Sequence, residues 1–196
     1  HGIVGEEFGG KTGQSDFTWI LDPIDGTRSY ICGTPTWMTL VGLKHKGSMV
    51  AGAAAQPVTG EIFAGSNQGA HLLQANQSRE LRCTTETDIA RVLAGTTAPS
   101  LYRKHGHLER LMRVENAVQS LRFDADSYFH CMTAAGQLGI SLDTGLQSYD
   151  IAALIPVIEG AGGIVTTWDG RDAGNGGDIL VAGNKALHEQ AMALLA

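Results

Sequence analysis

The order of the predicted elements constrains the fold of this chain more than any other feature of the sequence. Short apolar runs separated by turn residues predict strands through the first half, at 17–21, 36–44, 49–56, 59–64, 70–73 and 91–94. Helices are then predicted over 101–114, 126–138, 149–161 and 185–195, alternating with strands over 118–123, 140–142, 164–167 and 179–182. Strands first and alternation afterwards predict an α+β protein with stacked helical and sheet layers.

The chain is long enough to form this fold around a substantial core. It has 196 residues, of which 43% are hydrophobic, and no repeat or low-complexity linker divides it. We predict an N-terminal α+β subdomain over 1–118 and a C-terminal α/β subdomain over 119–196, packed as one unit. Because the first residues read as the middle of a domain, we expect an upstream part of the N-terminal subdomain to be missing.

Composition and charge argue against several classes of protein. Three cysteines without CxxC spacing fit neither a disulfide framework nor a zinc site. A net charge of −6 without a basic run argues against nucleic acid as a partner. The absence of a membrane-length apolar run and of a leader predicts a cytoplasmic protein that does not interact with membranes.

The strongest chemical signal follows the predicted strand 17–21. That strand ends in Asp22-Pro-Ile-Asp-Gly-Thr27, a turn that directs two carboxylates toward one point. Burying Asp22 and Asp25 as charges is costly unless a cation offsets their desolvation, and hard oxygen ligands favour Mg²⁺ over zinc. The alternative is a strand-to-loop turn in which the aspartates only cap the backbone.

Two further acidic elements accompany this turn. Glu6 belongs to Gly5-Glu-Glu7, upstream of the turn, and Asp150 lies near the start of an almost wholly apolar predicted helix. An acid among such apolar neighbours usually has a metal or another cation as its partner. For Asp150 the alternative is a favourable interaction with the helix dipole.

Two of these segments occur together in a known family. The string Trp-Ile-Leu-Asp-Pro-Ile-Asp-Gly-Thr-Arg at 19–28, followed by Ser-Tyr-Asp-Ile-Ala-Ala at 148–153 and Glu-Gly-Ala-Gly-Gly at 159–163, closely resembles the paired signatures of the inositol monophosphatase family. The resemblance runs from Gly5 almost to the C-terminus. It implies a layered α/β sandwich of the inositol monophosphatase and fructose-1,6-bisphosphatase type, here without the family's N-terminal helices.

The resemblance also implies a role for each matching residue. It implies Mg²⁺ held by the side chains of Glu6, Asp22, Asp25 and Asp150 and by the carbonyl oxygen of Ile24. Thr27 would act with Glu6 to orient and deprotonate a metal-bound water that attacks phosphorus. The backbone amides of Gly26 and Thr27 would hold the phosphate. The family also implies a homodimer.

Within the family, the segments 22–28, 33–40 and 149–156 look most like the histidinol-phosphate phosphatase branch. This likeness implies hydrolysis of a small phosphate monoester, histidinol phosphate, to histidinol and phosphate, as in histidine biosynthesis. The alternatives are an inositol monophosphatase, then a nucleotide 3′-phosphatase and, from another class, a non-catalytic regulatory or binding protein.

Substrate contacts are expected from the later part of the chain. Asp143 lies seven residues before Asp150, where the family has an acidic group that contacts the substrate. Asp126 resembles a substrate-side position, and an acid there suits an ammonium-bearing substrate. The alternative for Asp126 is a helix cap. His130 is predicted to pack in the core, and His105 and His107 to lie on a solvated helix face.

Overall fold

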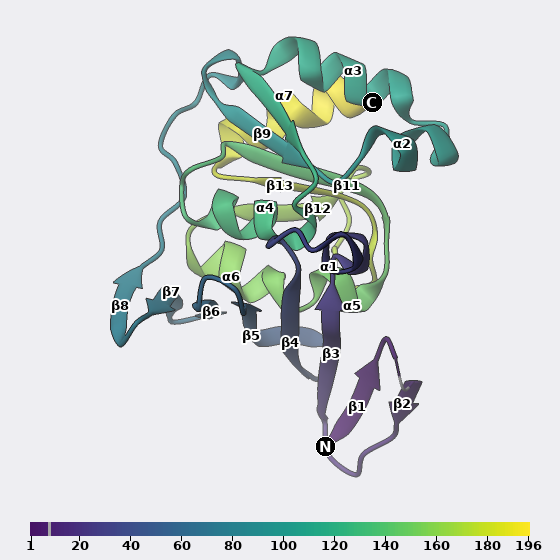
Figure 1. Cartoon of the computed structure of the whole chain (residues 1–196), viewed down its shortest axis with the longest axis vertical. Coiled ribbons are helices and arrows are strands. Elements are labelled where there is room, and N and C mark those ends of the chain that lie inside the picture. Colours follow the sequence, from purple (N-terminus) through teal and green to yellow (C-terminus); the bar gives the residue numbers. More distant parts are fainter. Residues whose placement is uncertain (8) are drawn as a thin grey trace.

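Two β-sheets form the framework of the protein (Figure 1). The computed structural model describes residues 1–7 and 9–196. The first sheet has eight strands in the order β2-β1-β3-β4-β5-β6-β7-β8. Its strands are β1 (Gly2–Gly5), β2 (Gly9–Lys11), β3 (Phe17–Asp25), β4 (Met38–His45), β5 (Ser48–Gln56), β6 (Glu61–Ser66), β7 (Gly69–Gln74) and β8 (Gln77–Glu80). It is antiparallel except where β1 pairs parallel with β3.

The second sheet has five strands in the order β10-β9-β11-β13-β12. These are β9 (Leu93–Thr96), β10 (Ser120–Phe123), β11 (Ile140–Leu146), β12 (Ile164–Thr167) and β13 (Gly177–Ala182). The chain passes from the first sheet to the second between β8 and β9. The division of the chain into domains at residue 118 stays a prediction.

The helices complete a stack of four layers (Figure 1). They are α1 (Thr27–Cys32), α2 (Pro99–His105), α3 (Leu108–Ala117), α4 (Asp126–Ala134), α5 (Ser148–Ile151), α6 (Leu154–Gly160) and α7 (Lys185–Leu195), with a 3₁₀ turn at Ile89–Arg91. Helices α4 and α6 contact each other and lie between the two sheets, whereas α3 and α7 pack together on the far side of the second sheet.

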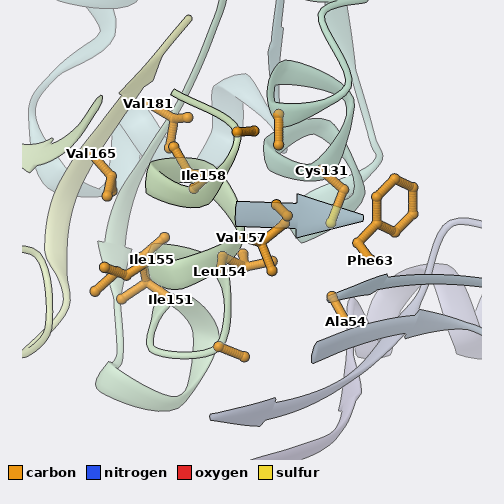
Figure 2. Close-up of a cluster of buried hydrophobic side chains, with 14 of the residues drawn as sticks. Ala54, Phe63, Cys131, Ile151, Leu154, Ile155, Val157, Ile158, Val165 and Val181 are labelled. Carbon is orange, nitrogen blue, oxygen red and sulfur yellow. The ribbon is translucent and has the colours of Figure 1, made fainter. Parts of the chain in front are cut away.

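Two hydrophobic cores hold these layers together. Figure 2 shows part of the core between the sheets, where Phe63 of the first sheet, Leu154 of α6 and Val181 of the second sheet are buried. The other core joins α3 and α7 to the second sheet through Leu111, Leu187 and their neighbours. Within residues 1–7 and 9–196, no helix combines the length and the apolar character needed to cross a membrane.

The structure corrects several predicted elements. The helix predicted over 101–114 is two helices, because Gly106 adopts a left-handed conformation (φ 76°) that ends α2. The helix predicted over 149–161 is also two, α5 and α6. It is interrupted at Ala152-Ala153, just before Pro156, which has no N–H to donate to an earlier carbonyl. Strands β1, β2 and β8 were not predicted, because each is short, and β2 and β8 contain no apolar side chain.

Glycines let α6 approach the first sheet closely. A Cβ atom on Gly52 of β5 would collide with the carbonyl group of Ala153, and one on Gly65 of β6 would collide with the backbone of Pro156 and Val157. Both contacts are with backbone atoms, which cannot rotate away as a side-chain end could. The absence of side chains at these two positions therefore sets the distance between the helical layer and the sheet.

We predict that Gly52→Ala destabilises the protein, by about 1–3 kcal/mol or more, because the added methyl group overpacks the contact between β5 and α6. Thermal and denaturant unfolding would measure the loss. Ser48→Thr is a matched control, since it adds a methyl group at an exposed position of the same strand. Equal stability of the two variants would contradict the proposed close packing.

Candidate active site

Neighbouring strand ends bring the first acidic groups together. Strands β1 and β3 run parallel with Gly5 paired to Leu21, so Glu6, which follows β1, lies beside Asp22. Asp22 belongs to β3, which continues to Asp25 and does not end at Leu21 as predicted. The pairing of β3 with β4 is irregular between Asp22 and Asp25, which accommodates Pro23. Asp22 and Asp25 are both buried, with exposed fractions of 1% and 8%.

A sharp turn follows these two acids. Gly26 has a left-handed conformation (φ 78°) that favours glycine and leads directly into α1. A Cβ atom there would also lie 2.8 Å from the carboxylate oxygen Oδ2 of Asp126. Gly26 therefore serves two purposes, since it permits the turn and leaves room for an acid from α4.

The third acid of the cluster comes from α5. Asp150 accepts a hydrogen bond from the backbone N–H of Gln147 at 2.7 Å and forms a capping box with that residue. Gln147 is the N-cap of this helix. Asp150 therefore stabilises the start of its helix, in line with the alternative that placed it there for a favourable interaction with the helix dipole. It also supplies an oxygen that lies within 4.8 Å of oxygens from Asp22 and Asp25.

Burial makes this cluster electrostatically unfavourable without a cation. The pKa of Asp22 is raised to about 8. Desolvation is the largest cause, and repulsion from Asp25 and interaction with Glu6 add to it. Desolvation also raises the pKa of Asp25 to about 8, although the Ser127 hydrogen bonds oppose the change. The pKa of Asp150 is raised to about 6, mainly by burial. A bound cation would remove this repulsion, and a set of carboxylate oxygens fits a hard divalent ion.

Glu6 lies at the margin of the cluster. Its carboxylate contributes to the raised pKa of Asp22, but Glu6 itself is exposed and is outside the group of three closely spaced acids. The predicted carbonyl ligand, Ile24, accepts a hydrogen bond from the Thr27 hydroxyl at 3.2 Å. The roles of Glu6 and Ile24 as metal ligands stay predictions, as do those of the three clustered aspartates.

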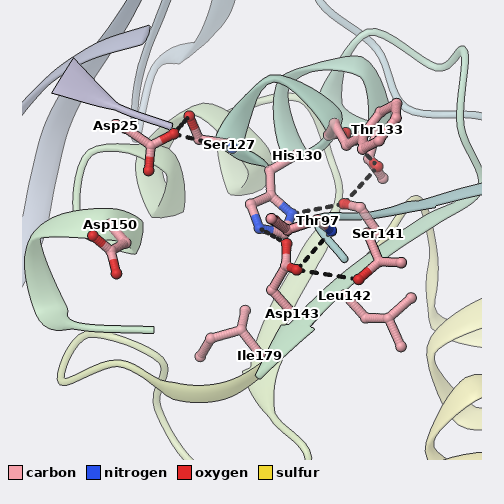
Figure 3. A network of polar contacts seen from close by, with 12 residues as sticks. Asp25, Thr97, Ser127, His130, Thr133, Ser141, Leu142, Asp143, Asp150 and Ile179 are labelled. Atoms are coloured by element: carbon pink, nitrogen blue, oxygen red, sulfur yellow. Dashed lines mark hydrogen bonds and ion pairs between the residues drawn. The ribbon is translucent and has the colours of Figure 1, made fainter. Parts of the chain in front are cut away.

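A cavity of about 310 Å³ opens beside the carboxylates. Most of the predicted site residues line it: Glu6, Asp25, Gly26, Thr27, Asp126, Asp143 and Asp150. Asp22 and Ile24 are outside this lining. Figure 3 shows Asp25 and Asp150 on one side of the site and Asp143 on the other. The fold therefore brings the predicted metal-binding and substrate-binding groups to one cavity.

The two predicted substrate contacts are held differently. Asp126 accepts a hydrogen bond from the Ser29 hydroxyl of α1 at 3.2 Å, and its own helix has Ala125 as the N-cap, so the helix-cap alternative does not describe its carboxylate. Asp143 is 1% exposed and accepts hydrogen bonds from Thr97 N–H at 2.8 Å and the Thr96 hydroxyl at 3.1 Å. Burial raises the pKa of Asp143 to about 7.

The sequence interpretation missed several residues of this cavity. His130, predicted to pack in the core, is buried but lines the cavity four residues after Asp126, on the same face of α4. Ser127 donates its hydroxyl and N–H to Asp25. Arg28 also lines the cavity, and its position in the Asp22–Arg28 motif could have indicated it.

The expected solvated histidines are also placed differently. His105 is half-buried and hydrogen-bonds through Nδ1 to the Thr144 hydroxyl at 3.0 Å. His107 lies 3.2 Å from the Asp178 carboxylate through Nε2 and packs against Trp168. The break at Gly106, which the predicted continuous helix lacked, lets both side chains reach the second sheet.

Comparison with known proteins decides the family. The model of the family described as "Inositol monophosphatase family" matches residues 1–196. The chain belongs to the inositol monophosphatase family. Like the rest of the family, it is a phosphoric monoester hydrolase. The resemblance inferred from the motifs is confirmed.

Named relatives support this assignment but differ in their activities. The chain is 33% identical to the bifunctional phosphatase IMPL2 of Arabidopsis thaliana, covering 98% of this chain and 58% of that protein. It is 30% identical to the histidinol-phosphatase of Mycobacterium tuberculosis, covering 99% of this chain and 75% of that protein. It is 32% identical to the inositol-1-monophosphatase of Mycobacterium bovis, covering 98% of this chain and 69% of that protein.

Solved structures confirm the expected fold. An inositol monophosphatase from Zymomonas mobilis has a TM-score of 0.87 and 29% identity, with 98% of this chain and 74% of that chain covered. The layered α+β architecture predicted from the sequence is therefore that of the family. These names leave the substrate open, because histidinol phosphatases and inositol monophosphatases are similar to the chain to about the same extent.

We predict that the metal-free protein loses stability as the pH rises through the range in which its clustered acids ionise. The folded-state pKa of Asp22 and Asp25 is about 8, above the usual aspartate pKa of 3.8. The folded state therefore binds more protons than the unfolded state between these values, and stability falls as the pH rises toward 8. Thermal unfolding in a chelator at pH 5.5 and pH 8 would measure this loss.

A divalent cation should reverse the effect. Added Mg²⁺ should raise the melting temperature more at pH 8 than at pH 5.5, because protons compete with the metal at the lower pH. Asp22→Asn is the matched variant, and its gain from Mg²⁺ should be smaller. A gain from Mg²⁺ that is independent of pH would contradict metal binding at these carboxylates.

Proposed function

We propose that the chain is a Mg²⁺-dependent phosphatase that hydrolyses histidinol phosphate. The observation that carries the proposal is a cavity at which two sets of acids meet, one suited to a metal ion and the other to the substrate. The clustered oxygens of Asp22, Asp25 and Asp150 suit a hard cation, and Asp25 and Asp150 line the cavity. Asp126 and Asp143 line the same cavity and can meet the part of the substrate beyond the phosphate.

The metal would supply positive charge that neutralises the phosphoryl oxygens and lowers the pKa of water at the site. Asp22, Asp25 and Asp150 would hold it, with Glu6 at the margin. The exposed carboxylate of Glu6 can accept the proton of the attacking water. The Thr27 hydroxyl donates to the Ile24 carbonyl, so its oxygen remains free to accept a hydrogen from that water and orient it.

The remaining groups bind the ester. Gly26 and Thr27 line the cavity, and their backbone amides would donate to the phosphate oxygens. Water attacks phosphorus in line as the bond to the leaving alcohol breaks, so no covalent enzyme intermediate is needed. The residues of this chain thus position the ester and accept a proton, and a protein nucleophile plays no part.

Electrostatics favour a cationic leaving group. Histidinol phosphate carries an ammonium group, whereas an inositol ring is neutral. Asp126 is near Asp25, Asp143 and Asp150, since its charge contributes to the raised pKa of each. An ammonium group would relieve this repulsion, and a charge-assisted hydrogen bond contributes about 1.5–3 kcal/mol. The expected homodimer and cytoplasmic location stay predictions.

Phosphate release tests the proposal directly. We expect the protein to hydrolyse histidinol phosphate faster than inositol 1-phosphate, with Mg²⁺ required for both. Asp22→Asn should nearly abolish turnover, because it removes a ligand charge and misplaces the water. Turnover by this variant within a few fold of the unmutated protein at saturating Mg²⁺ would overturn the metal assignment. Preference for inositol 1-phosphate would favour inositol monophosphatase activity.

Asp126 is predicted to select the cationic substrate. Asp126→Asn should raise KM for histidinol phosphate roughly tenfold or more, because a loss of about 1.4 kcal/mol is a factor of ten. Hydrolysis of an uncharged ester should be nearly unaltered. Asp124→Asn is the control, since it removes the same charge from an exposed position two residues away. An equal loss on both substrates would mean that Asp126 supports the fold or the metal site.

A further inference from the structure

His130 is a buried polar group in the cavity wall that the proposed reaction does not use. Its side chain is 1% exposed. The Nδ1 atom lies 2.8 Å from the Ser141 hydroxyl, but the buried Nε2 atom has no hydrogen-bond partner among the described residues. A buried polar atom without a partner is costly, so its placement requires an explanation.

The nearest group to this nitrogen is a predicted substrate contact. Nε2 lies 3.6 Å from Oδ2 of Asp143, slightly too far for a hydrogen bond (Figure 3). The other oxygen of Asp143, Oδ1, already accepts from the Thr97 N–H and the Thr96 hydroxyl. The carboxylate is therefore anchored at Oδ1, while Oδ2 has His130 beside it.

The Asp143 carboxylate, more than the hydroxyl groups behind the ring, favours a proton on Nε2. Ser141 Oγ lies 2.8 Å from His130 Nδ1 and 2.9 Å from the Thr133 hydroxyl, which also lies 3.1 Å from the Phe129 carbonyl oxygen. Because Thr133 has one proton for these two partners, Ser141 can either donate to Nδ1 or accept from it. With Asp143 ionised, a proton on Nδ1 would place the Nε2 lone pair against Oδ2, an unfavourable arrangement of two acceptors, whereas a proton on Nε2 faces the carboxylate.

Burial keeps the ring neutral. The pKa of His130 is lowered to about 4 by desolvation, so at neutral pH the imidazole has one N–H. A movement of a few tenths of an ångström would bring Nε2 within hydrogen-bond distance of Oδ2. Such a movement is small for a carboxylate anchored through only one of its oxygens.

We propose that His130 is a positioning residue for substrate binding, whose Nε2–H holds Oδ2 of Asp143 in the orientation that receives the leaving group. The inference rests on the proposed function, since it names what orients one of the substrate contacts. His130 acts through Asp143 and need not touch the phosphate or the metal. Its loss should therefore weaken binding of the ester and have little effect on the rate of hydrolysis once it is bound.

Two substitutions separate the two ring nitrogens. In His130→Gln the side-chain amide can place an N–H where Nε2 lies, whereas in His130→Asn the shorter amide reaches only the position of Nδ1. We expect His130→Asn to raise KM for histidinol phosphate roughly tenfold, the equivalent of one hydrogen bond of about 1.4 kcal/mol, with kcat within a few fold. His130→Gln should keep KM within about threefold of the unmutated value.

Controls exclude a general effect on folding. His188→Gln makes the same substitution at a half-buried histidine of α7, where Nε2 meets the Thr166 hydroxyl, and should leave KM unchanged. Thermal unfolding would show whether each variant is folded. With para-nitrophenyl phosphate, whose leaving group has no ammonium or aliphatic hydroxyl for Asp143, KM should be unaltered in all three variants. Equal KM values for His130→Gln and His130→Asn with histidinol phosphate would overturn the proposal.

A spectroscopic measurement tests the contact without any turnover. Long-range ¹H–¹⁵N correlation spectra of the metal-free protein should show His130 as the neutral Nε2–H tautomer, assigned by the signal that His130→Gln removes. An Nδ1–H tautomer would overturn the proposal. If the unmutated protein releases no phosphate from any ester, the proposed function fails, whereas the His130 tautomer still decides whether this nitrogen can donate to Asp143.

Discussion

Repulsion among buried carboxylates is the constraint on which the rest of the site depends. Oxygens of Asp22, Asp25 and Asp150 lie within 4.8 Å of one another in a partly desolvated site, and each pKa is raised. The surrounding structure opposes this repulsion only in part. Ile24, Ser127 and Gln147 each donate a backbone N–H to one of the three acids, which fixes the carboxylates but leaves oxygens available for a cation.

The stacking of layers explains how these acids come together. Asp22 and Asp25 end a strand of the first sheet, whereas Asp150 begins a helix that follows β11 of the second sheet. Helix α6, which continues from α5, packs against strands of the first sheet through the glycine contacts at Gly52 and Gly65. A change in that packing would shift Asp150 relative to the other two acids. The geometry of the cluster is therefore coupled to the core between the sheets.

Local chemistry explains why much of this could be predicted from the sequence. A proline between Asp22 and Asp25 and a glycine directly after Asp25 mark the end of β3. Helix α5 combines an acid with apolar neighbours, so all three clustered acids were predicted. The strands predicted over 36–44 and 49–56 form the antiparallel pair β4 and β5. Short strands such as β1 lack the alternation that marks a strand, so they could not be inferred from local pattern.

The substrate side of the cavity depends on contacts between segments that are distant in the sequence. Asp143 is anchored by Thr96 and Thr97 at the end of β9, and Asp126 by Ser29 of α1. His130 was assigned to packing because its i, i+4 relation to Asp126 has meaning only once α4 is placed against the second sheet. The residues proposed to bind the metal were therefore visible in two short motifs, whereas the network around Asp143 was not.

One close contact determines where α4 lies against the second sheet. Gly95 of β9 has no side chain, and a Cβ atom there would collide with the ring of Phe129 on α4. Phe129 directly precedes His130, so this contact also sets the distance between His130 and Asp143. A larger residue at position 95 would displace α4 and move Asp126 with it. Because Ser127 of α4 donates its N–H to Asp25, the same displacement would also affect one of the residues proposed to bind the metal. Substrate selection and the proposed metal site are therefore coupled through α4.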